Sequence, residues 1–397
     1  MRLADRALKI SPSPTLAIDA RAKQMIAAGE KVINFGVGEP DFDTPEHIKT
    51  AAVDAIRAGM TKYTPVAGTV ELKKAIVQKL RRDQNLEYDP AQIVVSVGAK
   101  HALYNAIQVL CQPGDEVILP APYWVSYLEQ IKLAGARPVI VNTAMENGFK
   151  LTPADLSAVA TSHTRLLILN SPGNPTGAVY TSAELQALTE IILEHEMAVI
   201  SDEIYEKLIY DGLEHISIVS LNPAMKERTV IVNGVSKAYA MTGWRIGYAA
   251  APLPVASAMA DLQSHATSNP ASIAQQAAVA ALAGSQEPLE QMVAEFAFRR
   301  DYMLERLLVI PGLACNQPGG AFYLFPNVQA YFGRPYQGKV IRSASDLAEV
   351  LLDEAKVAVV PGVAFGNDNY IRLSYATSLK NIEDGLNRMA AILALIR

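Results

Sequence analysis

A lysine and an arginine, Lys237 and Arg245, lie in a loop rich in small residues that follows the apolar run Thr229–Asn233. The run predicts a strand, and ligands of open α/β sheets bind where strands end. A lysine placed there can be desolvated and made nucleophilic toward carbonyl groups, and an arginine offers a planar fork to a phosphate. An ordinary exposed lysine is the alternative interpretation.

A carboxylate and an amide follow two further predicted strands. Asp202 ends the strongly apolar run Met197–Asp202, and Tyr205 lies three residues later, where it can reach the same side of a turn. Taken alone, Asp202 is better explained as the N-cap of a following helix than as the partner of a buried cation. Asn174 lies in the turn Asn170–Gly177, where two prolines and two glycines would hold its amide in one orientation.

Gly98 and Ala99 lie at the start of a predicted helix, Lys100–Leu110, directly after the apolar run Ile93–Val97. The first amides of a helix and the positive end of its dipole together favour an anion. Lys100 in the first turn opposes that dipole, so we expect it to face a bound negative group. The alternative is a lysine that points into water.

Arg372 lies in the apolar segment Tyr370–Tyr375 near the end of the chain. An arginine in such a segment usually pairs with a carboxylate. That carboxylate could belong to the protein or to a ligand, and the segment alone favours neither.

Motifs for other cofactors and for metals are missing. The Gly- and Pro-rich segment Asn34–Pro45 is not G-x-G-x-x-G, and the chain has no G-x-x-x-x-G-K-[ST] loop and no H-E-x-x-H or other metal-ligand spacing. We therefore expect no metal, and a nicotinamide cofactor gains little support.

Composition argues against several classes of protein. The 397 residues carry 35 Lys and Arg against 40 Asp and Glu, a net charge of −5, which argues against binding of nucleic acid through a basic face. There is no apolar run of about 18 residues and no signal-peptide pattern at the N-terminus. The two cysteines, Cys111 and Cys315, are too few for a disulfide framework. We expect a cytoplasmic protein that inserts into no membrane.

Short apolar runs alternate with helical periodicity through the first two thirds of the chain, which predicts an α/β domain whose mostly parallel sheet has helices on both faces. The predicted strands are Ile93–Val97, Glu116–Leu119, Arg137–Val141, Leu166–Asn170, Met197–Asp202, Thr229–Asn233 and Gly247–Ala250. The predicted helices between them are Lys100–Leu110, Val125–Ala134, Ser182–Glu194 and Val255–His265.

The pattern changes after about Ala283, where a smaller α+β unit is expected. Its predicted elements are the helix Leu289–Leu308, the strand Ala321–Phe325, the helix Ser343–Ala355, the strands Val357–Val360 and Ile371–Ser374, and the helix Asn381–Ile396. We expect a large domain at residues 45–285 and a small domain at residues 286–397. The N-terminal segment, residues 1–44, is expected to join the small domain, so that both chain ends form it.

Taken together and in this order, these segments resemble the class I aminotransferases, which are pyridoxal-phosphate enzymes of the aspartate aminotransferase fold. Lys237–Gly247 matches the lysine signature of that family, and the other matching stretches are Gly38–His47, Pro122–Tyr127, Asn174–Gly177 and Met241–Gly247. They are similar to bacterial-type aspartate aminotransferases and equally to aspartate/prephenate aminotransferases. The resemblance covers essentially the whole chain and implies a fold-type I architecture with a seven-stranded, mostly parallel sheet.

The resemblance implies that pyridoxal 5′-phosphate is the cofactor. Lys237 is similar to the lysine that forms the Schiff base and then moves a proton, and Asp202 to the carboxylate that keeps the pyridine nitrogen protonated. Tyr205 resembles the catalytic tyrosine that, together with an asparagine, binds the phenolic oxygen. The remaining cofactor-binding residues, which include that asparagine, the stacking indole and the phosphate-binding groups, are Asn174, Trp124, Gly98, Ala99, Lys100 and Arg245.

The resemblance also assigns the substrate contacts. Arg372 is similar to the arginine that binds the α-carboxylate with help from the amide of Gly38, and Lys100 to the lysine that binds the side-chain carboxylate of aspartate. Thr15 lies where the family has a mobile N-terminal segment that closes over the substrate. Two residues of the cofactor site also border the substrate, Trp124 and Asn174.

Tyr63 resembles the tyrosine that reaches the phosphate in the neighbouring subunit, which implies a homodimer with shared sites. The chain also departs from the family at three places. Ser11 stands where relatives carry a lysine, and residues 268–270 hold no counterpart of the arginine that another branch lends across the dimer. Tyr127 replaces a histidine beside the cofactor aspartate, so we expect that contact to be missing. Recognition of a distal carboxylate then rests mainly on Lys100, a point charge and not a fork.

The function implied is transamination of L-aspartate with 2-oxoglutarate, giving oxaloacetate and L-glutamate by a ping-pong mechanism. An arogenate-forming prephenate aminotransferase, or an enzyme with both activities, is the alternative. A lyase on the same fold is disfavoured by the distal carboxylate site. A non-catalytic sensor that binds the cofactor is disfavoured because the chain has no room for a DNA-binding domain.

Overall fold

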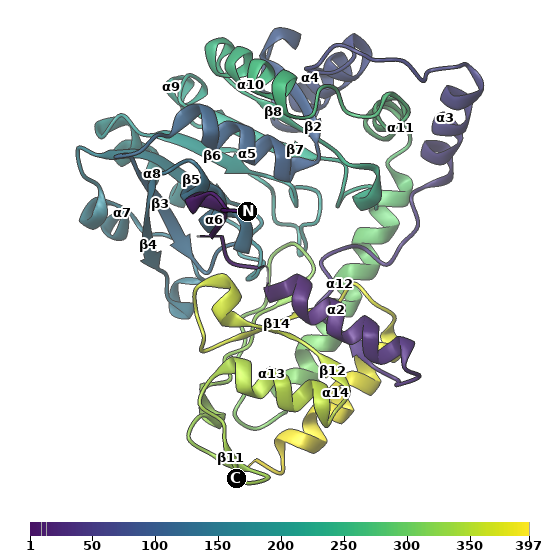
Figure 1. The fold of residues 1–397 in the computed structure, drawn as a ribbon, viewed down its shortest axis with the longest axis vertical. Coiled ribbons are helices and arrows are strands. Elements are labelled where there is room, and N and C mark those ends of the chain that lie inside the picture. The colour runs from purple at the N-terminus through teal and green to yellow at the C-terminus, as the bar shows by residue number, and fades with distance from the viewer. Residues whose placement is uncertain (9, 13, 397) are drawn as a thin grey trace.

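A seven-stranded sheet forms the broad part of the molecule in the computed structural model, which describes residues 1–8, 10–12 and 14–396 (Figure 1). Each of the seven predicted strands is formed, with ends that differ by at most two residues. In spatial order the strands are β2 (Ile93–Val97), β8 (Ile246–Ala250), β7 (Thr229–Gly234), β6 (Ala198–Asp202), β5 (Thr164–Asn170), β3 (Glu116–Ala121) and β4 (Arg137–Asn142).

The sheet is mostly parallel, as predicted. Only β8 runs against its neighbours, β2 and β7, while β7, β6, β5, β3 and β4 follow one another in parallel. Alternate residues of β5 enter two different hydrophobic clusters, Leu166 and Ile168 one and Leu167 and Leu169 the other. Both faces of the central strands are therefore buried, which explains why these strands are apolar on both faces, whereas the edge strand β4 stays partly exposed.

Helices cover the two faces of the sheet. Residues of α5 (Ala99–Leu110), α6 (Val125–Leu133) and α10 (Leu253–Ala266) supply one cluster. The other cluster includes residues of α4 (Val70–Gln84), α8 (Ser182–Glu194) and α11 (Ser272–Ala283) and continues into the narrower part of the molecule. Helices α4 and α11 are not among the predicted helices, and neither are α3 (Glu46–Arg57), α7 (Pro153–Val159) and α9 (Pro223–Lys226).

The narrower part of the molecule contains elements from both ends of the chain (Figure 1). The long helix α12 (Glu287–Leu308) leads into it from the broad part. A three-stranded antiparallel sheet has the order β13 (Val360–Pro361), β14 (Ile371–Ser374), β9 (Tyr323–Leu324). The other elements of the narrower part are α2 (Pro14–Ala27), β1 (Ile33–Asn34), β10 (Pro335–Tyr336), β11 (Lys339–Val340), α13 (Ala344–Asp353), β12 (Val357–Ala358) and α14 (Leu379–Leu393). The first short helix, α1 (Asp5–Leu8), lies instead over the broad part (Figure 1), and the amide of Ser11 donates to Glu129 of α6.

One predicted strand, Val357–Val360, is divided in the structure. Its first half is β12, which pairs in parallel with the N-terminal strand β1, and its second half is β13, which pairs with β14. The short run therefore serves two sheets and ties the N-terminal segment to the C-terminal unit. Among the described helices, none has both the length and the apolar character that crossing a bilayer requires.

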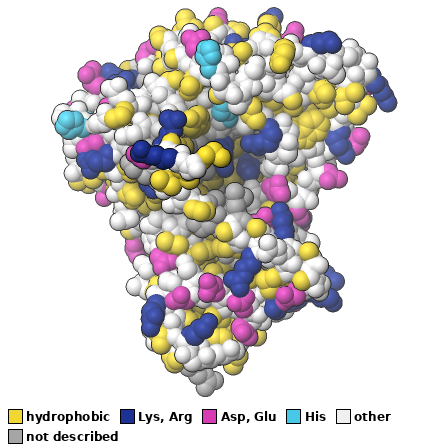
Figure 2. All heavy atoms as spheres, viewed as in Figure 1, with side chains coloured by type: hydrophobic (Ala, Val, Ile, Leu, Met, Phe, Trp, Pro, Cys, Tyr) yellow, Lys and Arg dark blue, Asp and Glu magenta, His cyan; other side chains and the backbone are white. Residues whose placement is uncertain are grey.

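The arrangement of the strands brings the chemically interesting loops together. Asn170 at the end of β5 lies beside Asp202 at the end of β6, and Asp202 lies beside Val232 of β7. The loops that leave these three neighbouring strands therefore open at one edge of the sheet, where ligands of α/β folds bind. Figure 2 shows a hollow on this face between the broad and the narrow part of the molecule.

Candidate active site

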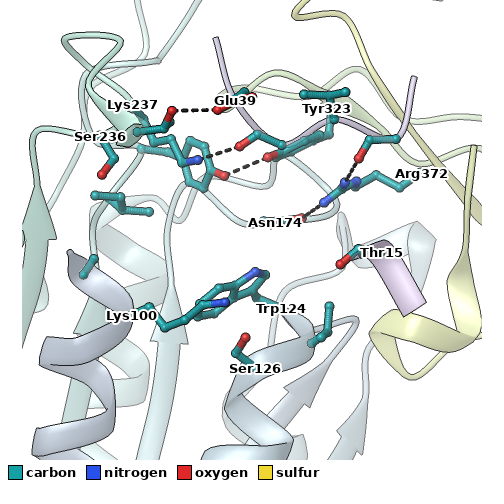
Figure 3. Close-up of a pocket in the computed structure, with 18 of the residues that line it drawn as sticks. Thr15, Glu39, Lys100, Trp124, Ser126, Asn174, Ser236, Lys237, Tyr323 and Arg372 are labelled. Carbon is teal, nitrogen blue, oxygen red and sulfur yellow. Dashed lines mark hydrogen bonds between the residues drawn. The ribbon is translucent and has the colours of Figure 1, made fainter. Parts of the chain in front are cut away.

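A pocket of about 580 Å³ lies at this edge of the sheet, between the two parts of the molecule (Figure 3). Twelve of the thirteen predicted site residues line it or form its wall, although they come from distant parts of the sequence. The lining residues include Thr15, Gly38, Ala99, Lys100, Trp124, Asn174, Asp202, Tyr205, Lys237, Arg245 and Arg372. Gly98 is packed directly beneath Arg245 in the same wall.

Lys237 lies in the loop that follows β7, and its ammonium group donates a hydrogen bond to the carbonyl oxygen of Gly38 at 2.6 Å (Figure 3). Burial lowers the pKa of Lys237 to about 8, and the charges of Arg372 and Arg245 act in the same direction, against Glu39 and Asp202. A larger share of the neutral amine is therefore present near neutral pH than for an exposed lysine. The neutral amine is the form that attacks a carbonyl group.

Asp202 ends β6 with a carboxylate that is buried and held from two sides. Its Oδ2 accepts a hydrogen bond from the hydroxyl of Tyr127 at 2.6 Å, and its Oδ1 accepts one from the amide of Ile204 at 3.2 Å. Burial raises the pKa of Asp202 to about 6, and the two hydrogen bonds oppose that rise. The carboxylate faces the pocket as a fixed negative charge for a cationic group of a ligand.

Two expectations about Asp202 are wrong. The contact expected to be missing is made by Tyr127, because the phenol hydroxyl reaches the carboxylate. Asp202 does not cap a following helix either: the chain turns through residues 204–207, and the carboxylate accepts only the amide of Ile204 in that turn. The aspartate is thus free to serve the pocket.

Asn174 and Tyr205 contribute polar groups to the same wall. The carbonyl oxygen of the Asn174 side chain accepts a hydrogen bond from Arg372 at 3.0 Å, so its NH₂ group is the donor that remains for a ligand. The hydroxyl of Tyr205 lies 2.8 Å from that of Tyr323. Burial raises the pKa of Tyr205 well above its ordinary value, so this hydroxyl keeps its proton.

The groups predicted to hold a phosphate meet at the start of α5. Gly98 has a φ of +81°, and a Cβ atom there would lie 2.4 Å from Nη2 of Arg245. Only glycine leaves room for the guanidinium group over the helix N-terminus. Arg245 is anchored there by its bond to the carbonyl oxygen of Thr242 at 2.8 Å. The first helix amides, the dipole and the arginine together make an anion site, so these residues fit the phosphate of the predicted cofactor.

Trp124 and Lys100 form the opposite side of the pocket (Figure 3). The Nζ atom of Lys100 lies 4.9 Å from the centre of the indole ring. Within the described parts of the chain Lys100 forms no ion pair. Its pKa is lowered by loss of solvent and by the charge of Arg245. This cation therefore faces the pocket without an acidic partner, as its place in the first turn of α5 predicts.

Arg372 is a buried cation, and its hydrogen-bond partners among the described residues are neutral. Its Nη1 donates to Asn174 at 3.0 Å and its Nη2 to the carbonyl oxygen of Gly36 at 2.8 Å. The ring of Tyr323 lies against the guanidinium at 4.4 Å. Among the described residues no carboxylate lies within ion-pair distance, and Nε has no hydrogen-bond partner. A buried charge without a counter-ion is costly, so this guanidinium is suited to a carboxylate that a ligand brings.

Tyr63 is the one predicted site residue that the structure does not bring to the pocket. It lies between α3 and α4 and is 91% exposed. Tyr63 is therefore too far from the pocket of its own subunit to bind a ligand there. Its predicted contact with the phosphate in a neighbouring subunit is not tested by a single chain.

Several pocket residues were not predicted from the sequence. Tyr323 binds Tyr205 and packs on Arg372, and Glu39 accepts a hydrogen bond from Thr242 at 2.6 Å beside Lys237 (Figure 3). The signal for Tyr323 was its place in the predicted strand Ala321–Phe325, but the strand alone does not say which pocket its side chain enters. Glu39 lies within the matched stretch Gly38–His47 and could have been noted there.

A cluster of charged side chains lies behind Asp202, away from the pocket. Glu203, Glu206 and His215 are close enough to consider as metal ligands. The ammonium group of Lys79 contacts Glu206, and His215 lies 3.0 Å from Glu203. The cluster thus contains cations of its own, which is typical of a buried structural ion network.

Comparison with known proteins agrees with this site. Residues 30–389 match the family described as aminotransferase class I and II. An aspartate aminotransferase of Geobacillus stearothermophilus is 53% identical over 98% of both chains, and an aspartate/prephenate aminotransferase of Nitrosomonas europaea is 45% identical over 99% of this chain and 100% of that one. The crystal structure of the aspartate aminotransferase from Rhizobium meliloti, 46% identical, covers 100% of both chains with a TM-score of 0.97. The predicted family, fold and cofactor, pyridoxal 5′-phosphate, are thereby confirmed, and the chain belongs to the class I and II aminotransferases.

Proposed function

We propose that this aminotransferase moves the amino group of L-aspartate to 2-oxoglutarate in a ping-pong cycle. The observation that carries the proposal is a pair of cations that face one pocket without a carboxylate of the described chain, Arg372 and Lys100. Two such cations fit a substrate with two carboxylates, since a monocarboxylic amino acid would leave one of the two charges uncompensated.

The residues proposed to hold the cofactor are those whose chemistry fits its parts. The phosphate would bind at Gly98, Ala99 and Arg245, and the ring would lie against Trp124. Asp202 would hold the proton on the pyridine nitrogen, and Asn174 and Tyr205 would donate to the phenolic oxygen. When bound, the cofactor supplies an electron sink for the carbanion formed at the substrate α-carbon.

Lys237 is proposed as the proton carrier of the reaction. Its lowered pKa lets the amine take a proton near neutral pH and return it. Arg372 would fix the α-carboxylate with help from the Gly38 amide, and Lys100 would fix the distal carboxylate. Thr15, on α2, also lines the pocket and would lie over the substrate.

Prephenate is the second acceptor that the site could take. It also carries two carboxylates, and Lys100 is a point charge that tolerates more than one position of the distal carboxylate. The relative from Nitrosomonas europaea has both substrates in its name.

A homodimer with shared sites is proposed from the position of Tyr63. Its ring is almost fully exposed, and the exposed apolar residues Val53, Ile56 and Val70 lie on the neighbouring helices. Figure 2 shows hydrophobic side chains gathered on that side, over α3. A second subunit would cover them and receive Tyr63. The dimer is proposed to work in the cytoplasm, which the two free cysteines Cys111 and Cys315 support.

Stopped-flow spectroscopy of the holoenzyme tests the substrate. Aspartate and glutamate are each expected to convert the bound cofactor to its amine form much faster than alanine, because alanine offers nothing to Lys100. Rapid conversion by arogenate would add the prephenate reaction. If alanine reacts as well as aspartate, the dicarboxylate proposal is wrong.

A further inference from the structure

A chain of hydrogen bonds joins helix α2 to Arg372 along the wall of the pocket. Asn34 donates from Nδ2 to the Asp19 carboxylate at 2.9 Å, and its Oδ1 accepts from the amide of Gly36 at 2.9 Å. The carbonyl oxygen of Gly36 in turn accepts from Nη2 of Arg372 at 2.8 Å. The Asn34 side chain thus uses both ends of its amide, so its orientation is fixed by two different elements.

The first member of this chain belongs to the helix that carries Thr15. Asp19 and Thr15 are four residues apart on α2, so they lie on the same face of the helix, and both line the pocket. One turn further along α2, Ala22 packs on the narrow part of the molecule, where it is buried against Leu352 and Ala358. The bond to Asn34 is a polar contact between this helix and β1 beside the pocket, and the exposed pair of Arg21 with Asp353 is another that holds α2.

Asp19 makes a second contact, an ion pair, whose strength can be compared with that of its bond to Asn34. Its second carboxylate oxygen pairs with Lys23, one turn later on the same helix, at 2.8 Å. The Asp19 side chain is 23% exposed and that of Lys23 is 70% exposed. The ion pair is exposed and within one helix, so it is worth little, whereas the bond to Asn34 connects two elements.

We propose that Asp19 and Asn34 are positioning residues that dock α2 over the pocket and connect it to the arginine that binds the substrate α-carboxylate. The connection means that a carboxylate on Arg372 and the docked position of α2 stabilise each other, as two linked equilibria must. This inference rests on the proposed function only for the role of Arg372. The docking itself concerns the resting holoenzyme.

Hydrogen exchange of the α2 amides in the holoenzyme, without substrate, tests the docking. Asp19→Ala and Asn34→Ala are each expected to speed exchange in α2 by about three- to tenfold, since each removes one partly exposed bond to a charged group. Alanine favours helix more than aspartate does, so faster exchange in Asp19→Ala would not come from weaker helix propensity. Lys23→Ala is the matched control, which removes the ion pair but leaves the bond to Asn34.

The double variant Asp19→Ala/Asn34→Ala decides whether the two residues act through one contact. Its exchange is expected to equal that of either single variant, and the KM for aspartate is expected to rise more than kcat falls in all three. Unchanged exchange in the single variants, additive effects in the double variant, or an equal effect of Lys23→Ala would each overturn the proposal. Failure of the dicarboxylate proposal would show separately, in the reaction of the wild-type enzyme with alanine.

Discussion

Removal of the Tyr127 hydroxyl should weaken the hold on the cofactor, although Tyr127 acts through Asp202. In Tyr127→Phe the buried Oδ2 of Asp202 loses its 2.6 Å donor, and the amide of Ile204 on Oδ1 remains. A hydrogen bond to a charged group is worth about 1.5–3 kcal/mol. The dissociation constant of the cofactor should therefore rise about ten- to a hundredfold.

The variant should also change how the affinity for the cofactor depends on pH. The hydrogen bond favours the carboxylate form of Asp202, whose pKa is about 6 because of burial. Without it, the pKa rises further, so the carboxylate is lost at a higher pH. The charges and phenols that face Asp202, namely Lys237, Glu203 and Tyr205, are unchanged in the variant. Cofactor affinity should therefore begin to fall at a higher pH in Tyr127→Phe than in the wild type.

Equilibrium dialysis of the cofactor against the apoenzyme, above and below pH 6, measures both effects. Tyr180→Phe is the control, because Tyr180 is also a buried tyrosine whose hydroxyl is bonded, to the amide of Leu151 at 2.7 Å. Tyr127→Phe should have no further effect in the Asp202→Asn background. Equal affinity of Tyr127→Phe and wild type at every pH, or an equal loss in Tyr180→Phe, would refute the reasoning.

Three further outcomes follow from the structure. Lys237→Ala should lose turnover while the fold and some cofactor binding remain, and retention of about a tenth of the wild-type rate would contradict its role. Lys100→Ala should lower kcat/KM for aspartate roughly ten- to a hundredfold but leave alanine nearly unchanged, whereas equal losses would place Lys100 on the cofactor phosphate. Glu203→Gln should destabilise the protein by about 3–5 kcal/mol in denaturant unfolding, because it breaks a buried ion network. The pKa of Glu203 is held at about 2, against an ordinary 4.5. The stability that the ionised Glu203 contributes is therefore present above pH 4.5 and should be lost as the pH falls toward 2. A wild-type free energy of unfolding that stays constant between pH 4.5 and pH 2 would contradict this expectation.

The sheet could be predicted from the sequence because its strands carry a local signal. A strand buried on both faces is apolar at nearly every position, as several of the seven predicted runs are, and all seven runs form strands of the central sheet. The short strands of the narrow part were harder to predict from the sequence. Val357–Val360 reads as one apolar run, but its two halves pair with partners more than 300 residues and about ten residues away, and no local pattern contains that division.

The types of the site residues were also determined by the sequence, since a lysine, an aspartate and an arginine in or after strands can serve as a nucleophile, an anion and a carboxylate-binding group. Their partners were not. From the sequence, Arg372 could equally be one half of an internal ion pair, and only the folded chain shows that its hydrogen-bond partners among the described residues are neutral. The replacement of a histidine by Tyr127 suggested that a contact with Asp202 would be missing, yet the Tyr127 hydroxyl reaches Asp202 across 75 residues of sequence. Residue type and local periodicity are properties of a segment, whereas the counter-ion of a buried charge and the pKa that follows from it depend on which distant segments the sheet brings to the same edge.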